Sequence, residues 1–236
     1  GQNIAYALRG LSKKEQQLRV NELLALVGLE GLADRDVTVI SGGEAKQLTR
    51  APKGVQHFAW SPNSIDIAYA ALNEPKNKTE IEKGFTGFEI TNNDMFVGSQ
   101  PLPSHIWLVN TKTSENKRLT DGDWTLPLVI PPSAPSSPFS WSADGKTIAY
   151  TLTGYTFEAN KGNTDIYLMP LGGTQTVNIT LANDAWDGAP IYSPDGNYIA
   201  YRTHSIPGYE ADRFRISVFN TKTLISEVIT EDFDYT

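Results

Sequence analysis

The residue types of hydrolytic catalysis occur in this sequence, but they are scattered along it. The three histidines, His57, His105 and His204, lie in different segments. Ser61 and Ser193 lie in turn-like motifs, where a hydroxyl commonly bonds nearby backbone. A serine nucleophile needs an oriented base and an exposed elbow, and no G-x-S-x-G occurs in the sequence. We therefore expect structural histidines and no catalytic residue in this chain.

A second group of candidates is acidic. Glu74, Glu80, Glu82 and Glu89 lie within a long insertion from Asn73 to Ser104. Long loops on a rigid scaffold often carry binding residues. We take Glu80, Glu82 and Glu89 as candidates for contact with a substrate, and a solvated charged loop is the alternative interpretation.

The amino-acid composition limits which classes of partner and cofactor are expected. Twenty Lys and Arg against 27 Asp and Glu give a formal charge of -7, and no basic run is present. Neither nucleic acid nor a membrane surface is therefore expected as a partner. The absence of cysteine excludes thiolate metal sites, and we expect no cofactor. Because the sequence begins at Gly1, we expect upstream residues to be missing, and the composition does not choose between bacterial periplasm and cytoplasm.

The periodicity of the sequence changes near residue 36. Residues 1–35 are expected to be helical, with Ser12 and Glu15 forming a capping box. Residues 36–236 alternate with period two and are broken by Gly, Pro, Asn and Asp clusters, which predicts many short antiparallel strands. We therefore divide the chain into a helical segment, 1–35, and a β-rich domain, 36–236.

An internal repeat organises the β-rich domain. An aromatic strand, a turn and an Ile-Ala-Tyr strand recur three times, and each copy is followed by a second hairpin of constant length. The first halves are His57–Tyr69, Pro138–Tyr150 and Ala189–Tyr201, the second halves begin at His105, Asp165 and Arg215, and an isolated second half spans Asp36–Thr49. Four strands per unit match the period of a β-propeller blade.

The sequence therefore predicts an all-β fold, a partial β-propeller of about three blades and a half-blade, with a short helical N-terminal segment. Trp60, Trp141 and Tyr192 occupy the same place in each repeat, which indicates packing between blades. The segment Pro131–Pro138 is expected to be an extended connector between blades. An arc of blades leaves two faces and two strand edges open, so we also expect possible self-association.

The blade motif of residues 36–236 resembles the repeats of TolB-like propellers and of the N-terminal propeller of the prolyl oligopeptidase family of serine peptidases. The long insertion and the phrase Gln100–Asn110 look most like dipeptidyl or acylaminoacyl peptidases. This resemblance implies a propeller portion that gates peptide substrates, with hydrolysis carried out by a hydrolase domain outside this chain. Acidic propeller residues hold the substrate amino terminus in dipeptidyl peptidases. A TolB-like protein-binding module of the cell envelope is the alternative.

Residues 1–35 resemble a different family, the ATPases of ABC transporters, in their helical subdomain. Ser41–Glu44, SGGE, stands where such an ATPase carries its signature, a motif that holds a phosphate at a helix N-terminus. A G-x-x-x-x-G-K-[ST] loop is absent from the sequence. An ABC ATPase fragment is therefore the second alternative, and the junction is interpreted as a fusion of two unrelated pieces.

Overall fold

The computed structural model describes seven stretches of the chain, residues 12–26, 46–88, 102–127, 137–154, 163–173, 175–209 and 211–233. The chain divides into two units, residues 1–47 and 48–236. The predicted boundary between residues 35 and 36 lies outside the described stretches, as does Ser41–Glu44. None of the helices in these stretches is long and apolar enough to cross a membrane.

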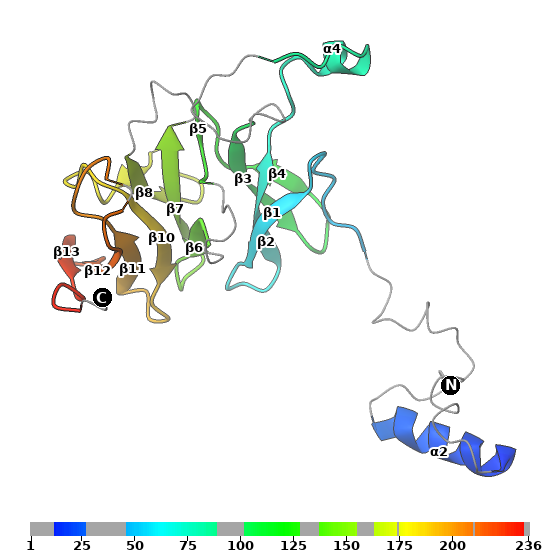
Figure 1. The fold of residues 1–236 in the computed structure, drawn as a ribbon. Coiled ribbons are helices and arrows are strands. Elements are labelled where there is room, and N and C mark those ends of the chain that lie inside the picture. Colours follow the sequence, from blue (N-terminus) through cyan, green and yellow to red (C-terminus); the bar gives the residue numbers. More distant parts are fainter. Residues whose placement is uncertain are drawn as a thin grey trace. The chain divides into compact units, whose positions relative to one another are not determined.

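The described part of the first unit is a helix, α2, which runs from Lys13 to Leu26 (Figure 1). The Glu15 carboxylate accepts hydrogen bonds from the Ser12 hydroxyl at 2.6 Å and from the Ser12 backbone N–H at 2.9 Å. The Glu15 N–H in turn donates to the Ser12 hydroxyl at 3.4 Å. These bonds confirm the predicted capping box and lower the pKa of Glu15.

The second unit contains three antiparallel sheets, which we call the N-terminal, middle and C-terminal blades (Figure 1). The N-terminal blade consists of β1 (Val55–Trp60), β2 (Asp66–Leu72), β3 (Ser104–Asn110) and β4 (Asn116–Arg118), with α4 (Lys78–Glu82) between β2 and β3. The middle blade consists of β5 (Trp124–Thr125), β6 (Phe139–Trp141), β7 (Thr147–Gly154), β8 (Thr164–Pro170) and β9 (Val177–Asn178). The C-terminal blade consists of β10 (Asp187–Tyr192), β11 (Tyr198–Thr203), β12 (Arg215–Asn220) and β13 (Ile225–Val228). This arrangement confirms the predicted all-β, propeller-type fold.

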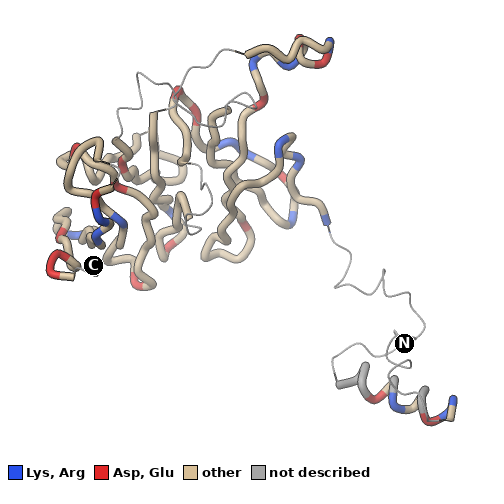
Figure 2. The backbone as a smooth tube through the Cα atoms, viewed as in Figure 1, with Lys and Arg blue, Asp and Glu red and all other residues tan. Residues whose placement is uncertain are grey.

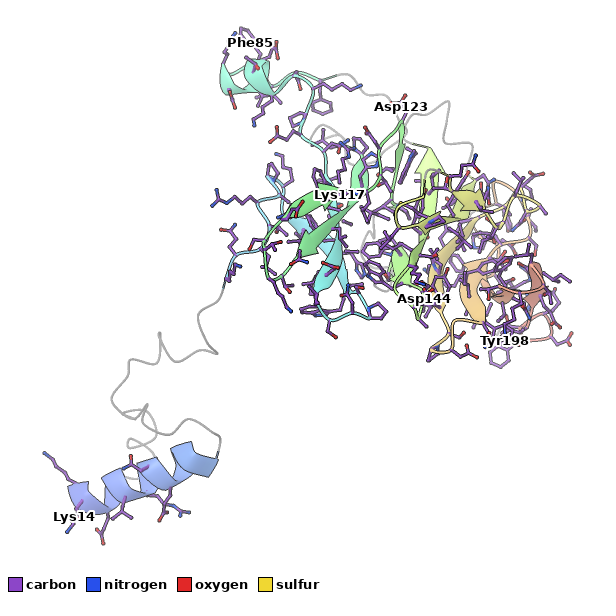
Figure 3. All side chains as sticks on the ribbon, turned by 180° about the vertical axis from the view of Figure 1, so that it is seen from behind. Lys14, Phe85, Lys117, Asp123, Asp144 and Tyr198 are labelled. Carbon is purple, nitrogen blue, oxygen red and sulfur yellow. The ribbon has the colours of Figure 1, made fainter. Side chains whose placement is uncertain are left out.

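The two ends of each blade differ in their connections. We call one end the loop face, because it carries the long connections that follow β2, β7 and β11. The other end, the turn face, carries the short Ser-Pro-Asp-Gly-type turns that precede these strands. Figure 3 shows Phe85 and Asp123 at the loop face, and Asp144 and Tyr198 at the turn face. The acidic insertion therefore emerges at the loop face.

The first strand of the middle blade is interrupted. Both β5 and β6 pair with β7, through Thr125 with Thr153 and through Phe139 with Tyr150. Most of the segment Pro131–Pro138, which was predicted to connect two blades, lies outside the described residues, and the strands on either side of it, β5 and β6, belong to one sheet. The register of the other first strands shifts at the matching place, between Val55 and His57 and between Gly188 and Ile191. An irregular register accommodates an insertion without breaking the rest of the ladder.

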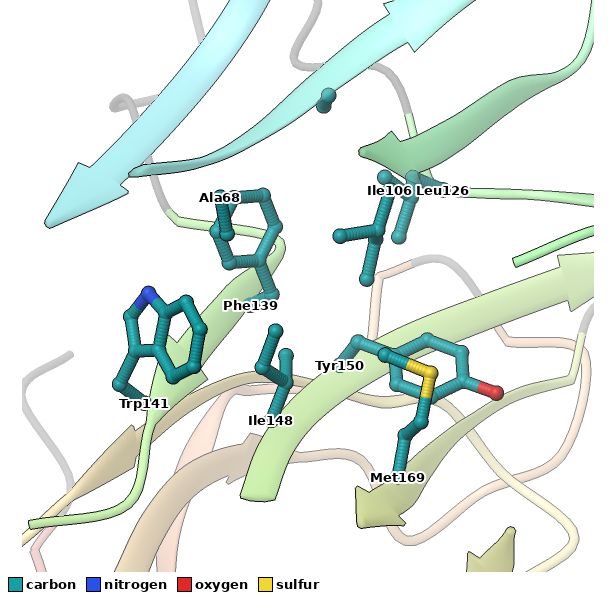
Figure 4. Close-up of a cluster of buried hydrophobic side chains, with 9 residues drawn as sticks. Ala68, Ile106, Leu126, Phe139, Trp141, Ile148, Tyr150 and Met169 are labelled. Atoms are coloured by element: carbon teal, nitrogen blue, oxygen red, sulfur yellow. The ribbon is translucent and has the colours of Figure 1, made fainter. Parts of the chain in front are cut away.

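The main hydrophobic core lies between the N-terminal and middle blades. It joins Ala68 and Ile106 of the first to Phe139, Trp141 and Ile148 of the second (Figure 4). A second core between the middle and C-terminal blades contains the buried residues Ala149, Ile166, Ile199, Tyr201 and Phe219. Each blade thus buries its apolar positions against the next, as stacked repeats do.

One of the three repeated aromatic residues does not pack as predicted. Trp141 is 8% exposed, and Tyr192 packs against the second core. Trp60, however, is 54% exposed, so the prediction that it lies between blades was wrong. Trp141 donates its indole N–H to the Ala59 carbonyl of the preceding blade at 3.2 Å. Among the described residues, no strand of a preceding blade stands in that place beside Trp60.

The half-blade predicted at Asp36–Thr49 is described only from residue 46 onward. Leu48 and Ala51 pack against a buried cluster that contains Tyr69 and Val109. The side-chain amide of Asn116 also donates to the Leu48 carbonyl at 3.0 Å. Residues 48–51 therefore cover part of the N-terminal blade, although Trp60 remains 54% exposed.

Candidate functional site

The acidic insertion leaves the N-terminal blade at a closed base. The Asn73 N–H donates to the Pro103 carbonyl at 2.8 Å, where β2 ends and β3 begins. The short helix α4 follows, and Lys78 bridges back to both carboxylate oxygens of Glu74 at 3.1 Å. The fold therefore holds the insertion at the loop face by backbone pairing at its base.

Two of the three predicted acidic contacts lie on or beside α4. Glu80 and Glu82 are exposed, whereas Glu89 lies outside the described residues. Lysines accompany the glutamates, and red and blue segments lie close together along this part of the chain in Figure 2. The described insertion contains three acidic and three basic side chains: Glu74, Glu80, Glu82, Lys76, Lys78 and Lys83. The described part of the insertion therefore offers individual carboxylates rather than a net negative patch.

One serine and one histidine come together, but not as a nucleophile and its base. The Ser137 hydroxyl lies 2.8 Å from His57 Nε2 and also donates to the Phe139 carbonyl. A hydroxyl has only one proton to donate, so the bond with His57 places the proton on the imidazole nitrogen. Burial lowers the pKa of His57, which keeps the ring neutral. The pair therefore joins the N-terminal and middle blades, with the Ser137 hydroxyl donating to a backbone carbonyl rather than to His57.

The turn serines bond locally, as predicted. The Ser193 hydroxyl donates to the Asp195 carboxylate at 2.5 Å and accepts from the Tyr198 N–H at 3.0 Å. Asn63 donates its N–H to Ser61 in the equivalent turn, at 3.4 Å. Hydrogen bonds from Ser193, the largest cause, and from Asn197 lower the pKa of Asp195 to about 2. These serines stabilise turns.

The other two histidines are buried among aromatic rings. His105 is fully buried, and its ring centroid lies 4.7 Å from that of Trp124. Burial, with a smaller contribution from Arg118, lowers its pKa to about 4. His204 lies 4.2 Å from the Phe214 ring, and burial lowers its pKa too. Neutral, enclosed imidazoles fit the structural role that the sequence predicted.

One buried carboxyl group was not predicted from the sequence. Asp187, at the start of β10 on the loop face, is 1% exposed and accepts a hydrogen bond from the Asn183 amide at 3.0 Å. Its Oδ1 has no hydrogen-bond partner among the described residues. Burial raises its pKa to about 7, against the hydrogen bonds from Thr203 and Asn183 that lower it. Only the burial distinguishes Asp187 from other strand-initial acids, and the sequence carries no signal of it.

A cleft of about 450 Å³ lies between the middle and C-terminal blades. It opens at the turn face, and Asp144, Leu168, Tyr192 and Asp195 contribute to its walls. Its two carboxylates already accept hydrogen bonds from turn serines. The cleft therefore lies at the opposite end of the blades from Glu80 and Glu82, and the described structure does not bring these residues into one site. No cluster of three side chains able to hold a metal ion occurs among the described residues.

No family model matches this sequence. It is 28% identical over 187 residues to dipeptidyl-peptidase 5 of Porphyromonas endodontalis, a match that covers 74% of this chain and 27% of that protein. A segment of 51 residues is 53% identical to the Fe(3+) ions import ATP-binding protein FbpC of Streptomyces coelicolor, covering 21% of this chain and 15% of that protein. Acylaminoacyl peptidase of Pyrococcus horikoshii matches with a TM-score of 0.50 at 15% identity, over 80% of this chain and 27% of its own.

The comparisons confirm both resemblances. Most of the chain is similar to the propeller portion of dipeptidyl peptidases of the prolyl oligopeptidase type, and a shorter segment is similar to an ATP-binding protein of an ion importer. The structural match supports the fold alone. The chain spans about a quarter of the length of the dipeptidyl-peptidase that it matches, 27%.

Proposed function

We propose that this chain is the substrate-gating propeller portion of a prolyl-oligopeptidase-like serine peptidase of the dipeptidyl or acylaminoacyl type. The observation that carries the proposal is the alignment with dipeptidyl-peptidase 5 over 74% of the chain. The absence of G-x-S-x-G from the sequence supports a gating rather than a hydrolytic role for these residues.

The peptide substrate would meet the propeller at its loop face. Glu80 and Glu82 stand there on an insertion with a backbone-paired base, and their carboxylates can accept hydrogen bonds from a free peptide ammonium group. Glu89, by its place in the same insertion, is the third candidate. Because the glutamates are exposed, each ion pair would contribute little affinity and would act mainly on selection.

The first experiment asks whether the chain hydrolyses peptides alone. We expect no release of dipeptides from a fluorogenic peptide substrate at any concentration of the chain. The reason is that the Ser137 hydroxyl donates to the Phe139 carbonyl rather than to His57. The Ser193 hydroxyl is likewise hydrogen-bonded to Asp195 and to the Tyr198 backbone N–H. Release that survives purification of the chain to homogeneity would contradict the proposal.

The second experiment tests the contact with the amino terminus. A peptide with a free amino group and its N-acetylated counterpart are titrated into the chain and into Glu80→Gln/Glu82→Gln. We expect the double variant to weaken binding of the free peptide about twofold to fivefold, the range of exposed ion pairs, and to leave the acetylated peptide unchanged. Glu227→Gln, at an exposed glutamate on β13, is the matched control. Equal weakening of both peptides would exclude recognition of the amino group.

A further inference from the structure

The cleft at the turn face has walls from two successive blades. The turn and the outer strands of the middle blade form one wall, and the first hairpin of the C-terminal blade forms much of the other. Its volume of about 450 Å³ falls within the range of ligand sites in proteins. The apolar part of its lining consists of Leu168, Pro170, Val177 and Tyr192. The cleft is therefore large enough for a side chain or a small ligand and can bury an apolar stem.

Two carboxylates line the same cleft. Asp144 and Asp195 occupy the same position of two successive turns. Hydrogen bonds from turn serines lower the pKa of both carboxyl groups, that of Asp195 to about 2, so both are charged at neutral pH. The exposed Lys146 follows the first turn, but among the described residues that line the cleft no side chain is basic. The cleft is therefore complementary to a cation.

The interface between the N-terminal and middle blades offers a comparison, because it contains the same repeat positions. Lys117 lies opposite Leu108 in the ladder of β4 with β3, and Val177 lies opposite Leu168 in the ladder of β9 with β8. Residues directly opposite each other in a ladder share one face of the sheet. At the position of Val177 in the cleft, the first interface therefore has a lysine.

The acidic residues, in contrast, are present at both interfaces. The positions equivalent to the cleft lining include Asp66 and Asp144 at the first interface, with Lys117 as the basic residue. The cleft has Asp144 and Asp195 but has Val177 in place of the lysine. The second interface thus keeps two carboxylates and lacks the ammonium group that accompanies them in the first.

Two further positions carry smaller side chains at the second interface. Tyr192 takes the place of Trp141, and Thr221 takes the place of Leu171. Trp141 is 8% exposed and Leu171 packs against the main core, whereas Tyr192 and Thr221 line the cleft. The space in the cleft therefore coincides with smaller residues as well as with the missing lysine.

We propose that this cleft binds the lysine side chain of a peptide, whose ammonium group donates hydrogen bonds to Asp144 and Asp195. The aliphatic stem packs on Leu168 and Val177, because a lysine can bury its stem on apolar surface while its ammonium group stays at a polar rim. The occupant follows from the charge of the cleft and from the lysine that the repeat itself places at this position. The site lies at the turn face and does not rest on the proposed function.

Titration with a blocked peptide, acetyl-Gly-Lys-Gly-amide, tests the site. Its only positive charge is the lysine ammonium, and a counterpart with norleucine has the same stem without that charge. We expect the lysine peptide to bind with a dissociation constant of about 1–10 mM and the norleucine peptide to bind about fivefold more weakly, since exposed ion pairs contribute little. Amide proton–nitrogen NMR spectra of the chain follow the binding, and the largest shifts should occur near Gly145 and Gly196, which lie in the two turns.

Filling the cleft with the lysine of the first interface is the sharpest test. Val177→Lys should weaken binding of the lysine peptide about tenfold or more, because its own ammonium group and stem would occupy the site. Val177 is 57% exposed, so the variant should fold. Leu181→Lys adds the same charge at a residue that is 77% exposed and outside the lining, and should bind as the wild-type chain does. Equal weakening by both variants would show an effect of net charge and would overturn the proposal.

The carboxylates are tested by removing one charge at a time. Asp144→Asn and Asp195→Asn should each weaken binding of the lysine peptide about twofold to fivefold, with little effect on the norleucine peptide. Asparagine can hold this turn, because Asn63 Oδ1 accepts the Ile65 N–H at 2.8 Å in the N-terminal blade. Asp123→Asn, at an exposed residue of the loop face, is the matched control and should not change binding. Equal binding of the two peptides to the wild-type chain, or no spectral shift up to about 20 mM peptide, would overturn the proposal.

Discussion

The interior interfaces and the end faces of the arc are built from the same repeat positions, yet they differ in burial. Phe139 is fully buried between two blades, whereas Phe58 is 62% exposed at an end. Ile166 and Ile216 show the same contrast. Burial in this molecule is therefore decided by whether a neighbouring blade is present, and the residue type alone does not reveal it.

The largest expected difference is in aromatic packing. Phe139→Ala should lower the free energy of unfolding by about 3–5 kcal/mol, because it leaves a cavity in the main core. Phe58→Ala removes a side chain that water already reaches, and should cost less than about 1 kcal/mol. Urea denaturation of both variants measures the two values. Equal costs for the two variants would contradict the contrast between interior and end.

The repeat explains which parts of the fold the sequence predicts. Three copies in register fix the order of strands from His57 to Tyr201, because each strand must alternate and each hairpin must turn at the same place. The capping box at Ser12 is equally local. Such features depend on neighbours within a few residues, which the sequence displays directly.

The features that were not predicted from the sequence depend on contacts between residues far apart along the chain. Trp60 has the same local sequence context as Trp141, and only the absence of a covering strand distinguishes it. The interruption between β5 and β6 requires the pairing of both with β7. The raised pKa of Asp187 results from burial. The candidate contacts Glu80 and Glu82 stay predictions, since the chain alone does not place them beside a substrate.

The next largest effect concerns a titratable interior position. His105 is enclosed by Trp124 of the next blade, while its counterpart in the C-terminal blade, Arg215, pairs with Asp212 instead. Burial lowers the pKa of His105 from 6.5 to about 4. The unfolded chain therefore binds more protons between these pH values, and stability is full above pH 6.5 and falls as the pH drops towards about 4.

The loss from this histidine should approach about 3 kcal/mol, at 1.36 kcal/mol per pKa unit. His105→Gln should flatten the pH dependence of the free energy of unfolding over that window. The difference in free energy of unfolding between the wild-type chain and His105→Gln, measured at each pH, cancels the contributions of the other titratable groups. An unchanged slope in His105→Gln would show that the next blade does not enclose His105.

Asp187 should give a smaller effect of opposite sign. Its folded-state pKa of about 7 lies above the ordinary value of 3.8, so the folded chain binds the extra proton between these values. Stability contributed by the protonated form is full below about pH 4 and is lost as the pH rises through about 7. Asp187→Asn should therefore raise the melting temperature at about pH 8, a gain of about 1–3 kcal/mol from removing a poorly paired buried charge. Asp184→Asn, at an exposed neighbour, should leave the melting temperature unchanged.

The smallest expected effect compares the turns of an end blade and an interior blade. Ser64 adopts a positive φ of 57°, where the middle and C-terminal blades have Gly145 at 68° and Gly196 at 71°. A left-handed residue costs less as glycine, so Ser64→Gly should stabilise the chain by about 0.5–1 kcal/mol. Gly145→Ala should destabilise it by a similar amount, because alanine disfavours the positive φ at this position. The new Cβ would lie 3.4 Å from the Ser61 hydroxyl, an ordinary contact distance, so sterics add little to this backbone cost. Thermal unfolding of both variants measures this pair. If Ser64→Gly instead destabilises the chain, the turn of the N-terminal blade differs from those at Gly145 and Gly196. End and interior blades would then be alike in their strands but not in this turn.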